Sequence, residues 1–149
     1  MIAPGQTLLE GRTAVVTGAS RGIGRAIAQA FVAHGARVIG TARSIDPADW
    51  ATADHVVPVA LDLSNADTIS DAVKAIRAAA PDGVDVLVNN AGMAHGGLFQ
   101  MTRPADLRAV FEANLFGPLA FTQQIARLMR KRPGAIVNTG SKQGITTPP

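Results

Sequence analysis

The feature that most restricts the fold of this chain is a glycine-rich turn, Thr17 to Gly24. It follows a short apolar run, Thr13 to Thr17, that is typical of a buried strand. After it, apolar residues recur at helical spacing as far as Gly35: Ile23, Ile27, Ala30 and Phe31. Glycines let a backbone approach a pyrophosphate closely, and the N–H groups at a helix start favour an anion. The pattern predicts a strand–turn–helix unit that holds the pyrophosphate of a dinucleotide.

The rest of the chain alternates between strand-like and helix-like periods. Further strands are expected at 37–41, 56–61, 85–88 and 135–138. Further helices are expected at 104–113, at 118–132 and after a cap at Ser64 or Asn65, where Ile69, Val73, Ile76 and Ala80 share a face. Alternating strands and helices imply a parallel sheet covered on both faces. We therefore predict an α/β fold, a Rossmann-like doubly wound parallel sheet of about five strands, in one domain over residues 1–149.

The amino-acid composition argues against several classes of protein. No apolar run is long enough to cross a bilayer, and the absence of cysteine excludes disulfides and thiolate metal sites. We expect a cytoplasmic protein with no membrane partner and no metal. The basic residues Arg127 and 130–132 fall at an expected helix end, where cations offset the helix dipole. Because no aromatic residues are interleaved with them, no nucleic-acid partner is expected. The segment 46–54, with Trp50, is expected to be an exposed loop.

Other motifs come after the later strands. Asp62 and Leu63 follow the third expected strand, and Asn-Asn-Ala-Gly follows the fourth, at 89–92. Asn114 lies in Phe-Glu-Ala-Asn-Leu-Phe-Gly, and Ser141 follows the fifth strand. Together with the Gly-x-x-x-Gly-x-Gly spacing of the turn, these motifs resemble the short-chain dehydrogenases/reductases, in family order across nearly the whole chain.

The resemblance implies roles for these residues. In the family the dinucleotide lies on the glycine turn, its adenine contacts the residues after the third strand, and the serine donates a hydrogen bond to the substrate oxygen. Ser141 and Asn114 are therefore the expected catalytic residues, with Asn114 ordering a water that conducts protons. The residues expected to bind the cofactor are Gly18, Ser20, Arg21, Gly22, Ile23, Gly24, Arg43, Asp62, Leu63, Asn89, Ala91 and Gly92.

The residues after the second strand favour NADP (NADPH) over NAD. An acidic residue there commonly binds the ribose 2′-hydroxyl of NAD, whereas a 2′-phosphate needs positive charge. Ala42 stands about where the acid would be, and Arg43 follows it. Arg21, in the glycine turn, supplies a second guanidinium, and each guanidinium can donate two hydrogen bonds to a phosphate. The alternative is that both arginines are merely exposed on loops.

The family's general acid is not found in this chain. It is a tyrosine, followed four residues later by a lysine, about a dozen residues beyond the serine. This sequence contains no tyrosine and ends at Pro149, and Lys142 is too close to Ser141 to match the lysine. His95 could face the substrate but is no obvious substitute acid. We expect an N-terminal portion of a longer, homo-oligomeric protein, with an exposed edge strand at 135–138 and no turnover by itself.

The favoured function is an NADP-dependent oxidoreductase that transfers hydride between nicotinamide and a small-molecule carbonyl or alcohol. The alternative is a non-catalytic dinucleotide sensor or partner subunit, which would need neither Ser141 nor Asn114. A sugar-nucleotide epimerase is disfavoured because its glycine turn usually has a different spacing.

Overall fold

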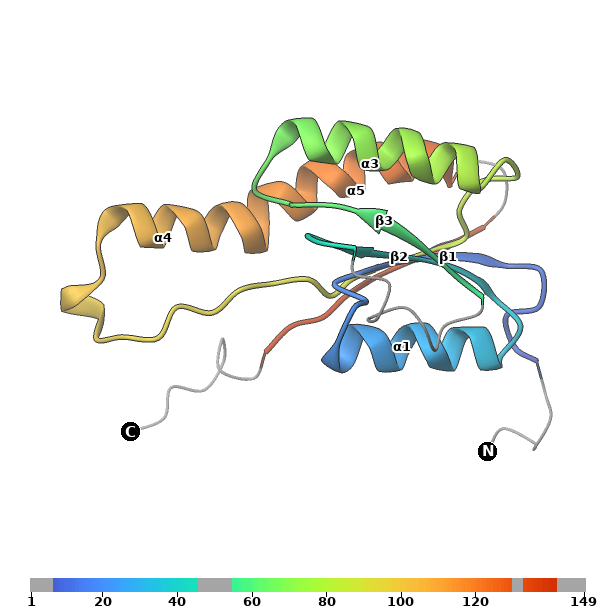
Figure 1. Cartoon of the computed structure of the whole chain (residues 1–149), viewed down its shortest axis with the longest axis horizontal. Coiled ribbons are helices and arrows are strands. Elements are labelled where there is room, and N and C mark those ends of the chain that lie inside the picture. Colours follow the sequence, from blue (N-terminus) through green and yellow to red (C-terminus); the bar gives the residue numbers. More distant parts are fainter. Residues whose placement is uncertain (1–6, 46–54, 130–132, 142–149) are drawn as a thin grey trace.

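The computed structural model describes residues 7–45, 55–129 and 133–141. Five parallel strands form one sheet in the order β3-β2-β1-β4-β5: β1 (Thr13–Thr17), β2 (Arg37–Ala42), β3 (Val56–Ala60), β4 (Val86–Asn89) and β5 (Ala135–Asn138). The helices are α1 (Gly22–Ala33), α3 (Ala66–Ala79), α4 (Pro104–Phe111) and α5 (Gly117–Leu128), with a 3₁₀ turn at Phe99–Met101 and a π-helix at Glu112–Phe116. Helix α1 covers one face of the sheet, and α3 and α5 cover the other (Figure 1). The predicted Rossmann-like doubly wound fold is confirmed.

The two faces of the central strand β1 belong to two separate cores. Because successive side chains of a strand point to opposite faces, Val15 and Val16 point in opposite directions. Val15 packs in a core with residues of α3 and α5, such as Ile76 and Phe121, whereas Val16 packs in a core that includes Ala28 of α1. All five residues of β1 are buried. The continuous apolar run therefore reflects a strand covered on both sides.

The start of α3 follows the sequence pattern closely. Of the two expected caps the structure uses Asn65, whose Oδ1 accepts hydrogen bonds from Asp67 N at 2.9 Å and Thr68 N at 3.5 Å. The expected apolar face is buried, with Ile76 completely inaccessible to solvent. The helix is thus fixed by its cap at one end and by its apolar face along its length.

Two of the apolar residues expected at helical spacing in α1 are exposed rather than buried. Ile23 is 65% exposed and Ala30 is also exposed, whereas the buried residues of the helix are Gly24 and Ala28. Small residues face the sheet because the first turn of α1 lies very close to the end of β1. Ile23 is left at the mouth of a pocket, described below.

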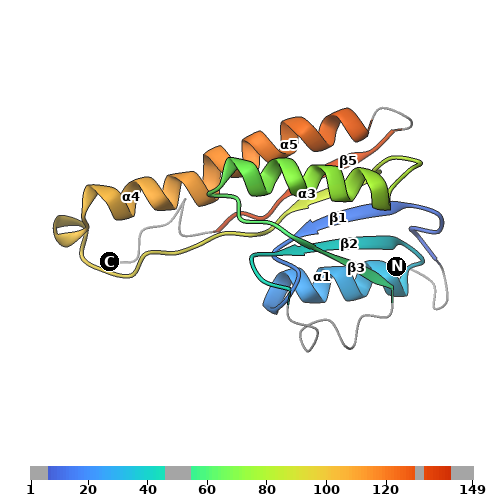
Figure 2. The same ribbon diagram turned by 45° about the horizontal axis from the view of Figure 1, so that its top comes forward.

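The expected break between helices at 104–113 and 118–132 is also wrong. Helix α4 runs into α5 through the π-helix Glu112–Phe116, and Figure 2 shows them as one long helical segment. In a regular α-helix the ring of Pro118 would clash with the carbonyl four residues earlier, and the wider π turn lies directly before it. Helix α5 ends at Leu128, and Arg127 in its last turn is exposed. Residues 46–54, with Trp50, and 130–132 lie outside the described residues.

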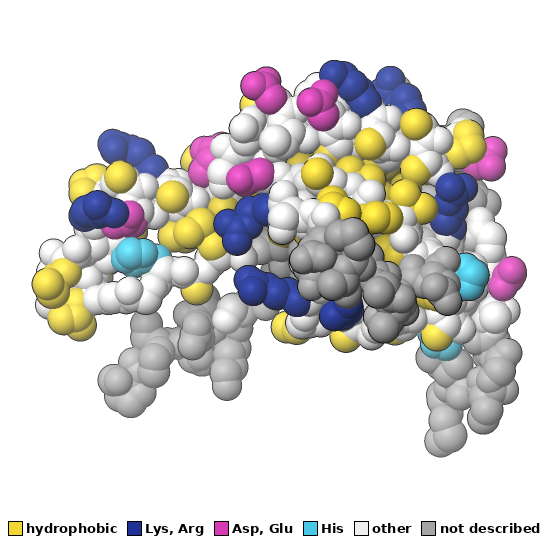
Figure 3. Space-filling view, viewed as in Figure 1, with side chains coloured by type: hydrophobic (Ala, Val, Ile, Leu, Met, Phe, Trp, Pro, Cys, Tyr) yellow, Lys and Arg dark blue, Asp and Glu magenta, His cyan; other side chains and the backbone are white. Residues whose placement is uncertain are grey.

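Two of the regions that expose apolar side chains lie at the periphery of the sheet. One is a projecting arm, residues 93–111, in which a loop runs beside α4 beyond the edge of the sheet (Figure 1). Phe99 and Met101 in this arm are 80% and 76% exposed, and Figure 3 shows hydrophobic side chains at its end. The other is the edge strand β5, where Ile136 and Val137 are exposed. The expected exposed edge at 135–138 is confirmed. Within the described ranges, no helix has the length and hydropathy needed to span a membrane.

Candidate functional site

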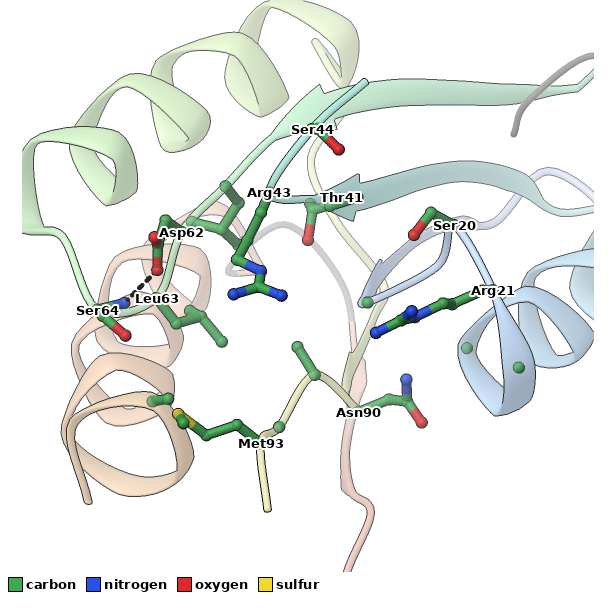
Figure 4. Close-up of a pocket in the computed structure, with 18 of the residues that line it drawn as sticks. Ser20, Arg21, Thr41, Arg43, Ser44, Asp62, Leu63, Ser64, Asn90 and Met93 are labelled. Carbon is green, nitrogen blue, oxygen red and sulfur yellow. Dashed lines mark hydrogen bonds between the residues drawn. The ribbon is translucent and has the colours of Figure 1, made fainter. Parts of the chain in front are cut away.

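A pocket of about 660 Å³ lies at the carboxyl ends of the strands, where the chain order reverses between β1 and β4 (Figure 4). This is the position at which open α/β sheets bind ligands, and the volume is in the usual range for cofactor sites. The pocket is lined by Gly18, Ser20, Arg21, Gly22, Ile23, Gly24, Thr41, Ala42, Arg43, Ser44, Leu61, Asp62, Leu63, Ser64, Asn90, Ala91, Gly92, Met93 and Ala113. Eleven of the twelve residues expected to bind the cofactor are in this set.

The glycine turn forms one wall of the pocket. Gly18 and Gly22 have φ angles of 69° and 55°, in the left-handed region that favours glycine. Gly24 has no room for a side chain, because a methyl group there would overlap the carbonyl oxygen of Gly18 and come within 2.5 Å of Asn90 Nδ2. The start of α1 is thereby packed against both the end of β1 and the segment after β4.

Thr17 connects the glycine turn to the segment after β4. Its side chain is completely buried, and Oγ1 accepts hydrogen bonds from the N–H groups of Asn90 and Ala91, both at 2.9 Å. The same hydroxyl donates to the Val88 carbonyl at 3.3 Å, and Asn90 Nδ2 donates to the Thr17 carbonyl at 3.0 Å. One side chain therefore sets the spacing between two walls of the pocket.

Replacing Thr17 with valine should disturb both walls. The substitution preserves shape but leaves two N–H groups without their acceptor, and we expect a loss of about 2 kcal/mol in the free energy of unfolding. Urea denaturation measures this loss. The control is Thr102→Val, because the Thr102 hydroxyl also donates to a backbone carbonyl, that of Leu98, but at an exposed site in the arm. Equal stability of the two variants would contradict the prediction.

Two arginines converge on the pocket. Figure 4 shows the guanidinium groups of Arg43, which follows β2, and Arg21, from the glycine turn, pointing toward each other across it. Neither forms an ion pair with a carboxylate among the described residues. Figure 3 shows Lys and Arg side chains gathered in the same part of the molecule. Two cations that face each other without a carboxylate partner favour the binding of an anion between them.

The catalytic candidates do not line the pocket. Both polar atoms of the Asn114 side chain bind the backbone of Met93: Oδ1 accepts from its N–H and Nδ2 donates to its carbonyl, each at 2.8 Å. Asn114 lies in the π-helix, and its Oδ1 is close to Gly92. The side chain thus fixes the pocket segment that Met93 belongs to. Ser141 is exposed, three residues after the end of β5.

Asn89 ends β4 and Asn90 follows it, and of the two the sequence pattern favoured Asn89, which does not line the pocket. Asn89 Nδ2 donates to Thr122 Oγ1 on α5 and to Asn138 Oδ1 on β5, each at 2.9 Å, so its side chain faces away from the pocket. Asn90, which was not expected as a site residue, lines the pocket instead. The alternation of side chains along an extended chain was the signal that could have separated them.

The titratable groups with shifted pKa values lie outside the pocket. Arg103 donates two hydrogen bonds to Asp106 at 2.8 Å, and these lower the pKa of Asp106 and raise the pKa of Arg103. Arg103 is exposed and Asp106 is partly buried at the start of α4, so the ion pair joins the residue before the helix to its first turn. His95 is exposed in the arm. Among the described residues, no group of three or more His, Cys, Asp or Glu could hold a metal ion.

Comparison with known proteins identifies the family. The family model described as short chain dehydrogenase matches residues 12–149. The chain belongs to the short-chain dehydrogenase family. It is 40% identical over 140 residues to a 3-oxoacyl-[acyl-carrier-protein] reductase of Vibrio cholerae, a match that covers 91% of this chain and 57% of the relative. It is 35% identical to dehydrogenase/reductase SDR family member 11 of Gallus gallus, covering 93% and 58%.

A solved short-chain dehydrogenase has the same fold. A crystal structure of such a protein from Streptomyces avermitilis superposes with a TM-score of 0.81 at 40% identity, covering 91% of this chain and 51% of that one. The chain therefore spans little more than half the length of these relatives.

Proposed function

We propose that this short-chain dehydrogenase binds NADPH in the pocket beside β1 and β4, as part of an oxidoreductase that acts on a carbonyl or alcohol carbon. The observation that carries the choice of NADPH is the convergence of Arg21 and Arg43. A 2′-phosphate placed between two guanidinium groups would accept charge-assisted hydrogen bonds from both. Ala42, at the end of β2, offers no carboxylate to repel it.

The remaining parts of the dinucleotide have places in the same pocket. The pyrophosphate fits the glycine turn, where Gly24 leaves the backbone open and the start of α1 favours negative charge. We assign the adenine to the wall formed by Asp62 and Leu63, and the nicotinamide to the side near Met93. When bound, the cofactor supplies the hydride, while the protein supplies orientation and proton handling.

Ser141 and Asn114 take different parts in this proposal. The Ser141 hydroxyl would donate a hydrogen bond to the substrate oxygen on which negative charge develops. Asn114, whose side-chain amide is bound to Met93, would position the pocket wall at the nicotinamide side. The relative from Vibrio cholerae is a reductase of 3-oxoacyl groups, which supports a carbonyl as the reacting group. The absence of cysteine supports a reducing compartment such as the cytoplasm.

Replacing Arg43 with aspartate tests the choice of cofactor. We expect the ratio of NADPH to NADH affinity to fall about 100-fold, because the variant loses charge-assisted hydrogen bonds and places a carboxylate near the 2′-phosphate. The two dissociation constants can be measured by calorimetric titration of the purified protein. Arg77→Asp, on the exposed surface of α3, makes the same change in net charge and should leave the ratio unchanged. An unchanged ratio in Arg43→Asp would refute the assignment.

A further inference from the structure

The wall of the pocket that follows β3 has no secondary structure of its own. It consists of residues 62–64, and Figure 4 shows the Leu63 side chain pointing into the pocket with Asp62 at its edge. Within the wall, the Ser64 N–H donates to Asp62 Oδ1 at 2.9 Å. A loop that contacts a ligand binds it more tightly if the loop is held in place beforehand. Contacts with α3 and α5 hold residues 62–64 in place.

A single hydroxyl binds both backbone groups of Asp62. Thr68 Oγ1, in the first turn of α3, donates to the Asp62 carbonyl at 2.6 Å and accepts from the Asp62 N–H at 3.2 Å. The Asn65 carbonyl, 2.9 Å away, is a second acceptor for the same hydroxyl. Asp62 is therefore attached to the start of α3, which is itself fixed by the Asn65 cap.

The other side of the wall lies against α5. Gly117 is buried at the start of that helix, and a methyl group there would overlap the carbonyl oxygen of Leu63. The close approach prevents Leu63 from moving back toward α5. Thr68 of α3 and Gly117 of α5 therefore both restrict the movement of residues 62–64.

We propose that Thr68 is a positioning residue for the adenosine end of the dinucleotide, acting through the backbone of Asp62 without touching the ligand. This inference rests on the proposed function, since it takes the wall at residues 62–64 as the adenine surface. Under this proposal the wall and the arginine pair bind different parts of the dinucleotide. The wall holds the part of the molecule that NADPH and NADH share, whereas Arg21 and Arg43 face the 2′-phosphate that only NADPH carries.

The test replaces Thr68 with valine, which keeps the β-branched shape and removes the hydroxyl. We expect the affinities for NADPH and NADH to fall by the same factor, about five- to tenfold, with their ratio unchanged. Thr68→Ser, which keeps the hydroxyl, should restore both affinities. In the protein without ligand, hydrogen exchange at the Asp62 amide should accelerate in Thr68→Val and return to the wild-type rate in Thr68→Ser.

A second variant separates positioning from stability. Asn65→Ala removes the cap of the same helix and should cost a comparable amount of stability, but it leaves the two hydrogen bonds between Thr68 and Asp62 intact. It should therefore lower the melting temperature without lowering dinucleotide affinity. Native affinity in Thr68→Val, or an equal loss in Asn65→Ala, would overturn the inference while leaving NADPH binding by the wild type intact. Failure of the wild-type protein to bind either dinucleotide would overturn the proposed function and this inference together.

Discussion

Replacing Gly24 with alanine is expected to reduce the affinity for NADPH by at least about 100-fold and to destabilise the fold by about 2 kcal/mol. The new methyl group would meet the backbone of Gly18, which cannot move without moving the end of β1, and the side-chain amide of Asn90. Both neighbours line the pocket, so relief of the overlap in either direction changes the surface that would face the pyrophosphate of the proposed cofactor. Calorimetric titration gives the affinity, and thermal unfolding should show a melting temperature lower by about 4–8 °C.

The matched control for this variant is Gly96→Ala. Gly96 lies in the exposed arm, where an added methyl group meets nothing within 4 Å and the backbone is not in the left-handed region. The control should retain the wild-type melting temperature and NADPH affinity. If Gly24→Ala behaved like Gly96→Ala, close packing at the start of α1 would not be what forms the pocket wall.

The second large effect is expected from Asp85, which is remote from the pocket. This carboxylate is only 2% exposed and precedes β4. Its Oδ2 accepts from Thr13 N at 2.8 Å and its Oδ1 accepts from Arg12 Nη1 at 3.0 Å. Its backbone carbonyl accepts from Ala135 N at 2.9 Å, so the residue connects the starts of β1, β4 and β5.

Asp85→Ala should lower the free energy of unfolding by about 2–3 kcal/mol, because the buried Thr13 N–H loses its acceptor and Arg12 loses its partner. Arg12 is partly exposed, which keeps the loss below that of a fully buried pair. Asp85→Asn, which retains one oxygen acceptor, should recover part of the stability. Asp71→Ala breaks an exposed pair with Lys74 and should change stability by less than about 0.5 kcal/mol. Urea denaturation that ranked Asp71→Ala as the more damaging change would contradict this account.

The fold was predictable because its signals are local and repeated. Each face of the sheet needs apolar residues at every second position of a buried strand, and each helix needs them at intervals of three and four. Ile69 and Ile76 on α3 carry that period and are buried as expected. The helical spacing of apolar residues did not identify the buried side of the first turn of α1. That turn lies so close to β1 that only Gly24 fits there, and Ile23 is exposed.

The positions of the site residues were predictable in part. The glycine turn and the two arginines could be recognised from residue type and their place after a strand, and all of them line one pocket. The roles of Thr17 and Thr68 could not, because nothing in the sequence shows which backbone groups a threonine hydroxyl binds. The same holds for Asn114, since its two hydrogen bonds to Met93 exist only because the π-helix brings it beside the arm.

The sequence by itself determined that the chain forms a parallel α/β sheet with a glycine turn at the carboxyl ends of the strands, where open α/β sheets bind ligands. These properties depend on residue types and intervals along the chain, which the sequence contains directly. Only the tertiary structure decided that Arg21 and Arg43 point toward each other and that Thr17 binds the segment after β4. These properties depend on distances between segments that are separate in the sequence, and such distances are set by how closely helices and strands pack.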